Sequence, residues 1–131
     1  ALHLNTLSFE LDFDLAKKLV NTEINRDTYA LAYISCDNLV NRQQQIDYIR
    51  ALGNDLADVV KIKVISSLLF LSRKPAKMAG VLALHEFLEK GFKSFKNLGN
   101  VEDFIIPIAN KEHQIMQQLA NPNSPNPLPY V

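Results

Sequence analysis

Several features that are common in proteins are scarce in this chain of 131 residues. Cys36 is the only cysteine, so an intramolecular disulfide is impossible, and this composition is typical of a reducing compartment. The four glycines are scattered and form no glycine-rich loop of the kind that holds a phosphate. No N-terminal run combines a basic segment, an apolar segment and a small-residue cleavage site. We therefore expect a cytoplasmic protein.

A long uninterrupted apolar run is also missing. The most apolar stretch, residues 56–71, contains Asp58, Lys61 and Lys63 and is shorter than the roughly 20 residues that a membrane span needs. We therefore expect no membrane contact. The hydrophobic share of 47% and the charged share of 21% are ordinary for a globular protein. We expect a single helical domain over residues 1–120 and an extended Pro-rich tail over residues 121–131.

The formal net charge is zero, but the charges are unevenly distributed along the chain. Residues 1–60 carry nine acids and five bases, and residues 97–131 carry three acids and one base. Residues 61–96 carry eight bases against Glu86 and Glu89, so this segment has a net charge of +6. Such a basic segment attracts phosphate groups or an acidic partner, provided that folding keeps the charges together.

The N-terminal segment shows an alternating pattern. Leu7, Phe9, Leu11 and Phe13 alternate with polar residues, and this period of two predicts a strand or an extended arm. From residue 13 the apolar residues recur at helical spacing, which predicts a first helix that ends near Asn25.

The middle of the chain has helical periods with clear breaks. Residues 27–52 predict one long helix or two abutting helices, with Asp27 or Thr28 as the cap and Gly53 as the stop. Residues 55–71 are apolar around nearly the whole helix circumference, which predicts a buried central helix. The β-branched run of residues 59–65 also fits a strand, so an α+β fold stays open as the alternative.

The last third of the chain is also mostly helical in pattern. Residues 76–96 have one apolar and one charged side, which predicts a surface helix that Gly99 closes. Asn100 is a suitable cap for a further helix, which we expect to break at Pro107 and to end near Ala120. Four prolines after residue 120 exclude a helix there. The sequence therefore predicts an all-α fold: a compact bundle of about five helices with an extended N-terminal segment and an extended tail.

Two segments are candidate binding sites. The first is the basic segment 61–96, where five side chains could form a contact surface for phosphate or nucleic acid: Lys61, Lys63, Arg73, Lys74 and Lys77. The competing interpretation is an ordinary solvated face, because Glu86 with Lys90 and Glu89 with Lys93 have the spacing of local ion pairs. The second is the tail, whose candidate contact residues are Pro125, Pro127, Pro129 and Tyr130.

No set of residues predicts catalysis or metal binding. His85 is followed four residues later by Glu89, where the zinc-protease pattern needs a second histidine, so we expect a structural histidine at the border of the apolar face. Cys36 has no nearby histidine to activate it and is expected to be a small buried side chain. We therefore expect no cofactor, no metal and no catalytic residue.

The preferred functional hypothesis is a non-enzymatic protein–protein interaction or regulatory module that acts through the surface of its helix bundle. Its partner would be another protein or a second copy of the chain, which makes a homodimer possible. Nucleic-acid or phosphate binding through residues 61–96 is the first alternative. A small-molecule pocket between helices is the second.

Overall fold

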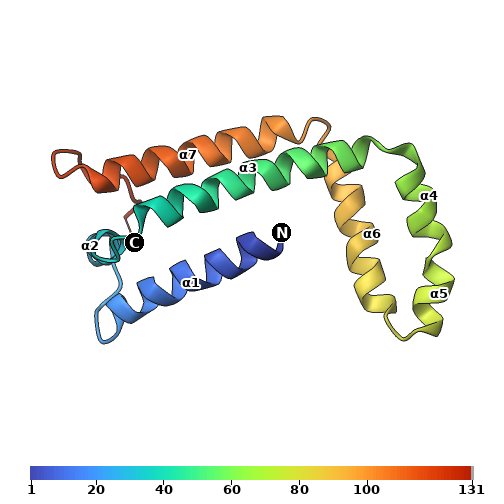
Figure 1. Ribbon diagram of the computed structural model, residues 1–131, viewed down its shortest axis with the longest axis horizontal. Helices are drawn as coiled ribbons and strands as arrows, with labels where there is room; N and C mark the ends of the chain where they lie inside the picture. The colour runs from blue at the N-terminus through green and yellow to red at the C-terminus, as the bar shows by residue number, and fades with distance from the viewer. Residues whose placement is uncertain (131) are drawn as a thin grey trace. The chain divides into compact units, whose positions relative to one another are not determined.

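The computed structural model describes residues 1–130 and forms seven α-helices and no strand in that part of the chain (Figure 1). The all-α prediction is therefore confirmed. Contacts divide the described chain into two units, which we call unit 1 (residues 1–51 and those from 106 on) and unit 2 (residues 52–105). Val131, the last residue of the predicted tail, lies outside the described residues. The helices are α1 (Leu2–Leu19), α2 (Arg26–Ser35), α3 (Leu39–Lys61), α4 (Lys63–Leu71), α5 (Arg73–Met78), α6 (Leu82–Asn97) and α7 (Glu102–Ala120).

The N-terminal segment is a helix, so the prediction of an extended arm is wrong. α1 includes the alternating residues 7–13. Side chains two positions apart on a helix point about 200° apart, so alternating apolar residues place apolar groups on two opposite helix faces. Leu11 and Leu15 lie on the buried face, whereas Phe9 and Phe13 lie on the exposed one. The period of two reflects a helix with two apolar faces.

α2 begins at a capping box that the sequence prediction located two or three residues too late. The Asn25 side-chain oxygen accepts hydrogen bonds from the backbone N–H groups of Asp27 and Thr28, each at 3.0 Å. The Thr28 hydroxyl oxygen accepts a hydrogen bond from the Asn25 N–H at 2.9 Å. Asn25 is therefore the cap, and it starts α2 where the first helix was expected to end.

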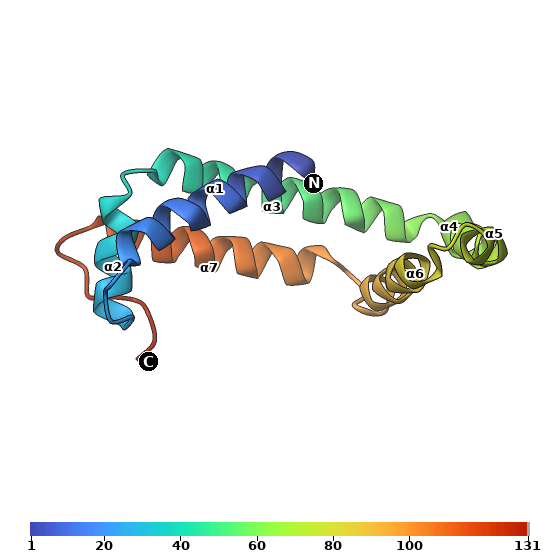
Figure 2. The same ribbon diagram turned by 90° about the horizontal axis from the view of Figure 1, so that it is seen from below.

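The core of unit 1 lies where α3 and α7 pack side by side (Figures 1 and 2). Ile46 of α3 and Ala109 and Met116 of α7 form a buried cluster, against which Tyr33 and Leu39 pack. α1 joins this core through its buried face: the buried Arg42 side chain donates a hydrogen bond from Nη2 to the Leu11 carbonyl at 3.3 Å.

Unit 2 has a much smaller buried core. Its buried residues are Gly53, Ala57, Ala76, His85 and Val101, so three of the five are glycine or alanine. Gly53 lies inside α3 against Ile105 instead of ending a helix, and the prediction of a stop there is wrong. A Cβ atom at Gly53 would lie 2.5 Å from Cγ2 of Ile105, so glycine is needed here for close packing.

The prediction that residues 55–71 form a buried central helix is wrong. The helix is interrupted at Ile62, whose ψ of 105° ends α3 and precedes α4, and no residue of α4 is buried in the described chain. Within unit 2, the helices in close contact with α4 are α5 and α6, so most of its circumference stays uncovered. An apolar circumference therefore does not guarantee burial when so few neighbouring helices are present.

The predicted helix over residues 76–96 is two helices. Gly80 has a φ of 75°, and the turn around it separates α5 from α6. Gly99, with a φ of 76°, closes α6 as predicted, and the Asn100 side chain accepts a hydrogen bond from the Glu102 N–H at 3.3 Å. α7 continues through Pro107, so the expected break there is wrong. The proline removes the N–H that would bond the carbonyl of Asp103, an exposed residue that water can hydrate.

None of the helices in the described part of the chain is both long and apolar enough to span a bilayer.

Candidate interaction surface

The most apolar face of α6 points away from α4, its neighbour in unit 2. Leu84, Phe87 and Leu88 are all more than half exposed, and Val81 just before the helix is also exposed. We call these four residues the α6 stripe. The side of α6 that faces α4 instead carries His85 and Glu89. On a helix of 3.6 residues per turn, this contacting side lies about a quarter turn from the centre of the α6 stripe. The same side also carries the half-buried Leu82 and Phe92, so α6 buries a mixed polar and apolar edge and leaves the α6 stripe exposed.

The contact between α4 and α6 is built on a buried histidine. His85 is 8% exposed, and its Nε2 lies 2.8 Å from the hydroxyl oxygen of Ser72. The same hydroxyl donates its single proton to the Leu69 carbonyl at 3.0 Å, so it bridges α4 and α6. The histidine is thus more buried than the border position predicted from the sequence.

Ser72, His85 and Glu89 occur in the order of a serine–histidine–carboxylate triad, but their bonding does not support catalysis. A general base must accept the hydroxyl proton of the nucleophile, and here the Ser72 hydroxyl donates to the Leu69 carbonyl. The Glu89 carboxylate lies 3.9 Å from His85 Nδ1, too far for a hydrogen bond. We therefore interpret the three residues as a structural link between helices.

A second exposed apolar row runs along α4 and α5. It has the three- and four-residue spacing of a helix-packing seam and consists of Val64, Leu68, Leu71, Pro75 and Met78, which we call the α4–α5 stripe. All five residues are exposed, and Met78 is 89% exposed. Helix neighbours at this spacing lie on one face, so the row forms an exposed apolar surface.

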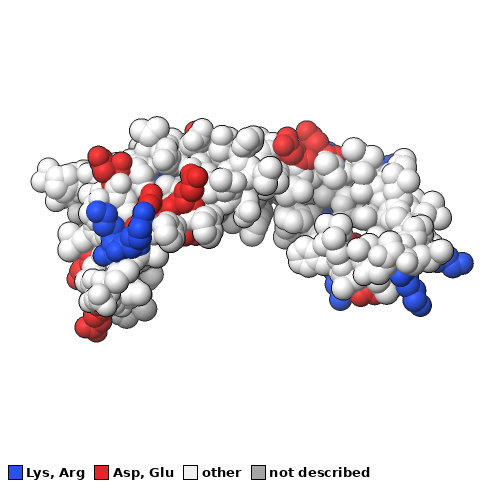
Figure 3. Space-filling view, turned by 60° about the horizontal axis from the view of Figure 1, so that its bottom comes forward, with Lys and Arg blue, Asp and Glu red and all other residues white. Residues whose placement is uncertain are grey.

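Three of the five predicted basic residues gather beside this stripe. Arg73, Lys74 and Lys77 line an open hollow of about 530 Å³ together with Phe70, Leu71 and Leu82. The part of unit 2 that is visible in Figure 3 is mostly uncharged surface, with Lys and Arg side chains and some Asp and Glu side chains at its margin. The hollow is therefore amphipathic: apolar side chains and cations share its lining.

The other two predicted basic residues do not line this hollow. Lys61, the last residue of α3, has its ammonium 3.8 Å from the Asp58 carboxylate, and Lys63 begins α4. Arg73 is also paired, with its Nη2 3.2 Å from a carboxylate oxygen of Glu86. Glu86 thus lies beside Arg73, and Glu89 lies beside His85. In the described chain, neither glutamate lies within ion-pair distance of the lysine four residues after it. The sequence did not single out Phe70 and Leu71 because it assigned them to a core.

A third apolar row lies on the exposed face of α1. It follows the same spacing over Leu2, Thr6, Phe9, Phe13, Ala16 and Val20, which we call the α1 stripe; Thr6 is its one polar member and Val20 directly follows the helix. The Lys17 ammonium lies 4.8 Å from the centre of the Phe13 ring. The rings of Phe9 and Phe13 are stacked, with centroids 6.2 Å apart. Leu11, on the opposite face, is 1% exposed, whereas Phe9 is 69% exposed. α1 therefore has one face in the core of unit 1 and one face without a partner in that unit.

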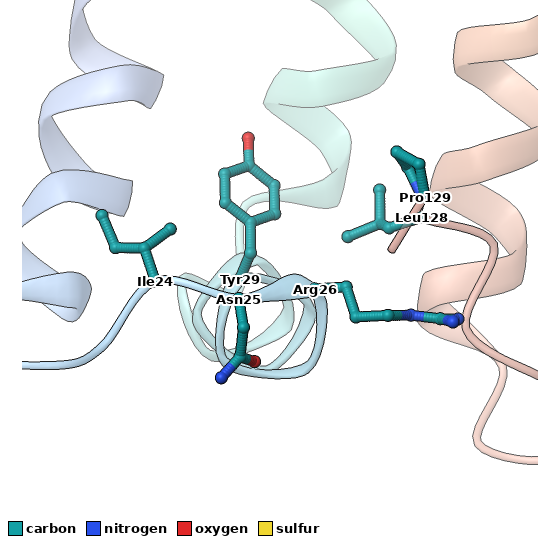
Figure 4. A pocket seen from close by; sticks show the side chains of 6 residues that line it. All are labelled: Ile24, Asn25, Arg26, Tyr29, Leu128 and Pro129. Atoms are coloured by element: carbon teal, nitrogen blue, oxygen red, sulfur yellow. The ribbon is translucent and has the colours of Figure 1, made fainter. Parts of the chain in front are cut away.

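The non-helical tail returns to the start of α2. The Asn126 carbonyl accepts a hydrogen bond from Arg26 Nη2 at 2.5 Å, and its side-chain Nδ2 donates to the Arg26 carbonyl at 3.1 Å. The Arg26 guanidinium lies 4.0 Å from the centre of the Tyr130 ring. Figure 4 shows Tyr29 between Ile24 on one side and tail residues on the other, around a small pocket of about 170 Å³.

The predicted tail residues have different positions at this contact. Pro129 lines the pocket, and Tyr130 contacts Arg26 through its ring while remaining largely exposed. Pro125 is exposed and Pro127 is half-buried. The sequence prediction missed Asn126, because its role depends on a residue 100 positions away.

No group of three or more His, Cys, Asp or Glu side chains in residues 1–130 is arranged to hold a metal ion. Cys36 is half-buried at the end of α2, and its thiol is free.

Comparison with known proteins gives a family but no relative of known activity. No curated protein matches the chain, and no solved structure matches it. A family model matches residues 1–127, nearly the whole chain. The protein therefore belongs to the family described as Domain of unknown function (DUF8198).

Proposed function

We propose that the protein is a non-enzymatic protein–protein interaction module that binds a helix of its partner on the exposed apolar stripes of unit 2. The observation that carries this proposal is the orientation of α6, whose apolar face points outward while His85 and Glu89 face α4. A surface helix normally buries its apolar residues. The exposure of the α6 stripe is explained if a partner covers it.

The size of the exposed apolar surface supports the same proposal. The α6 stripe and the α4–α5 stripe are separate surfaces of unit 2, and together with Phe70 their side chains expose roughly 1,000 Å². A stable interface buries about 800 Å² on each partner, and unit 2 has enough apolar surface for one.

Site-specific photocrosslinking in the cells that make the protein tests this proposal. A photoreactive residue at Phe87, within the α6 stripe, should form discrete crosslinked species, because a partner covers this position. The matched control is Lys93, which lies on the opposite side of α6. Crosslinks at Phe87 that are no stronger than those at Lys93 would contradict the proposal.

A double substitution tests whether the stripe itself causes the crosslinks. Leu84→Glu with Leu88→Glu should remove the crosslinks at Phe87 and leave the melting temperature unchanged, because both leucines are exposed in the free chain. Lys90→Glu with Lys93→Glu changes the polar side of the same helix and should leave the crosslinks in place. If the leucine variant keeps its crosslinks, the α6 stripe is not the binding surface.

A second candidate function is the binding of nucleic acid or another phosphate ligand, which the position of Arg73, Lys74 and Lys77 around one hollow favours. An electrophoretic shift of mixed DNA and RNA at two salt concentrations tests it. Binding through phosphates must weaken as salt rises, because counterions are released on binding. The absence of a shift at low salt, or an unchanged shift with Arg73→Glu, would remove this candidate.

A further inference from the structure

We infer that α4 and α5 lie on the surface of an anionic lipid bilayer, with the α4–α5 stripe in the acyl layer and the lysines beside it among the headgroups. The inference goes beyond the proposed function, because it concerns α4 and α5 and leaves the α6 stripe to a protein partner. A helix in the plane of a bilayer needs no spanning length, so the inference replaces the expectation of no membrane contact, which considered only a span.

The segment that contains α4 and α5 has no acidic residue. Residues 59–85 carry five bases, and all 14 acids of the chain lie outside this segment. Lys63, Lys74 and Lys77 are exposed, and none of the three lies within ion-pair distance of a carboxylate in the described chain. Lysine clusters of this kind are attracted to anionic lipids. The charge of the segment is therefore complementary to such a bilayer.

α4 and α5 present one continuous side to α6. The Ser72 N–H donates to the Leu68 carbonyl and the Ala76 N–H donates to the Ser72 carbonyl, each at 2.9 Å, so the helical turn continues across Ser72. The side toward α6 carries Ser72, which contacts His85, together with the buried Ala76 and the half-buried Leu69. At 3.6 residues per turn, the centre of the α4–α5 stripe lies about 110° from this side. The stripe therefore stays open along its length of about 21 Å.

Three lysines follow the free edge of the stripe. Lys63, Lys74 and Lys77 lie about 110° from its centre, on the edge opposite to the α6 contact. Lys74 and Lys77 also line the open hollow with Phe70 and Leu71, so these cations lie directly beside apolar side chains. Lysine stems can cover apolar surface while their ammonium groups reach into the headgroup layer. The stripe and its lysines thus have the arrangement of a helix that lies in a membrane interface.

The acids of α6 lie away from the stripe. Arg73 is about half a turn from the centre of the stripe, and it pairs with Glu86. Glu86 and Glu89 line a hollow with Arg73, Lys90 and Lys93, and no residue of the α4–α5 stripe lines that hollow. The two carboxylates are therefore not placed to repel an anionic surface from the stripe.

A bilayer fits this combination of residues better than a nucleic acid does. The phosphates of a nucleic acid would meet the lysines but would leave Leu71 and Met78, which are both exposed, in water. A bilayer surface buries apolar side chains and attracts lysines along the whole helix, without matched side chains in a partner. Both the apolar row and its basic edge are then used.

Sedimentation of the full chain with lipid vesicles tests the inference. We expect binding to phosphatidylcholine vesicles with about 30% phosphatidylserine, and binding about tenfold weaker or less to pure phosphatidylcholine. Lys74→Glu with Lys77→Glu should raise the dissociation constant for the anionic vesicles about 25-fold or more, at about fivefold for each lysine. Lys90→Glu with Lys93→Glu is the matched control, because it changes the net charge equally but away from the stripe. It should have a clearly smaller effect.

A tryptophan at the stripe reports insertion, because the chain contains none of its own. With the anionic vesicles, the emission of Met78→Trp should shift to shorter wavelength and be quenched by brominated acyl chains. Asn97→Trp is the control and should show neither change, since Asn97 is exposed on α6 and lines a hollow that contains no residue of the stripe.

Leu71→Gln with Met78→Gln distinguishes lipid from nucleic acid. Both positions are exposed, so the variant should stay folded, and its charge is unchanged. Binding to the anionic vesicles should weaken about tenfold or more, because apolar burial is lost. Binding to nucleic acid, if the lysines served that purpose, would be unaffected. Circular dichroism checks the folding of each variant, and Lys74→Gln with Lys77→Gln replaces the charge reversal if that variant loses its helices.

Three results would overturn the inference: no sedimentation of the original protein with anionic vesicles, an equal loss of binding in the two lysine variants, or an unchanged emission of Met78→Trp. A nucleic-acid shift without vesicle binding would assign the lysines to nucleic acid instead. Photocrosslinking at Phe87 separates these failures from that of the proposed function. Crosslinks at Phe87 without vesicle binding would retain the interaction module and reject the lipid contact, and vesicle binding without those crosslinks would do the reverse.

Discussion

Arg26 and Asn126 lie 100 positions apart and exchange two hydrogen bonds, one from the Arg26 guanidinium and one from the Asn126 side-chain amide. Asn126 Nδ2 also lies 3.1 Å from a carboxylate oxygen of Asp27, and its side-chain oxygen accepts from the Leu128 N–H at 3.0 Å. One asparagine therefore fixes the tail to the first turn of α2 and also shapes the tail itself.

Replacing this asparagine should release the tail. Asn126→Ala removes the side-chain bonds to Arg26, Asp27 and Leu128, so we expect the free energy of unfolding to fall by about 1–2 kcal/mol. Chemical denaturation measures this change, and amide hydrogen exchange of Leu128 should become faster. Asn123→Ala is the control, because the Asn123 side chain is exposed and makes no hydrogen bond within the described chain. Equal effects of the two substitutions would contradict this account of the tail.

The predictions from sequence succeeded where the signal was local. The all-α class, the end of α6 at Gly99 and the non-helical tail each depend on the residues in the segment itself. The start of α2 was missed by only two or three residues, because Asn25, Asp27 and Thr28 are all good capping residues.

The failures concern contacts between segments. An apolar period of two is shared by a half-buried strand and by a helix with two apolar faces, and only the neighbours of α1 distinguish them. The exposure of Phe70 and Leu71 depends on how few helices surround α4. Gly53 had the position of a helix stop, but its actual role depends on Ile105, 52 positions away. Sequence reasoning therefore named the three cations that line the hollow but not the apolar residues Phe70, Leu71 and Leu82 beside them, and whether this hollow binds anything stays a prediction.

Gly53 and Gly91 make a matched pair of helical glycines. A Cβ atom at Gly53 would lie 2.5 Å and 2.7 Å from two carbons of Ile105, whereas one at Gly91 would meet no atom within 4 Å. We expect Gly53→Ala to destabilise the protein by about 1–3 kcal/mol through this steric conflict. Gly91→Ala should stabilise it by about 0.5–1 kcal/mol through helix propensity alone.

Thermal or chemical unfolding of both glycine variants checks these opposite signs. A second substitution tests the cause: Ile105→Ala should reduce the penalty of Gly53→Ala, because the conflicting carbons are then absent. A stabilising Gly53→Ala would mean that α3 and the segment at Ile105 do not pack this closely.

The link between Ser72 and His85 should contribute to the stability of unit 2. Ser72→Ala leaves Nε2 of the buried His85 ring without its hydrogen-bond partner, and such a loss costs about 1–3 kcal/mol. Ser67→Ala, at an exposed position of the same helix, is the control and should change stability by less than about 0.5 kcal/mol. Urea unfolding compares the two variants, and an equal midpoint would show that the hydrogen bond contributes nothing to stability.

Tyr33 makes the stability of the protein depend on pH in the alkaline range. Burial raises the pKa of Tyr33 above its ordinary value of 10.0; the charge of Arg42 opposes this rise, and Glu112 adds to it. The unfolded chain therefore releases the phenol proton at a lower pH than the folded chain does. The contribution of Tyr33 to stability is complete below pH 10 and decreases as the pH rises through and above that value.

Replacing Tyr33 by phenylalanine, which lacks the ionisable hydroxyl group, removes this pH dependence. Between about pH 9 and pH 11, the free energy of unfolding of the Tyr33→Phe variant should fall less steeply with rising pH than that of the original protein. Tyr130→Phe, at a 90% exposed position, is the control and should keep the original slope. Urea unfolding at several pH values gives both slopes. If Tyr33→Phe keeps the original slope, Tyr33 ionises equally well in the folded and unfolded chain, and its packing in the core of unit 1 must be looser than the structure has it.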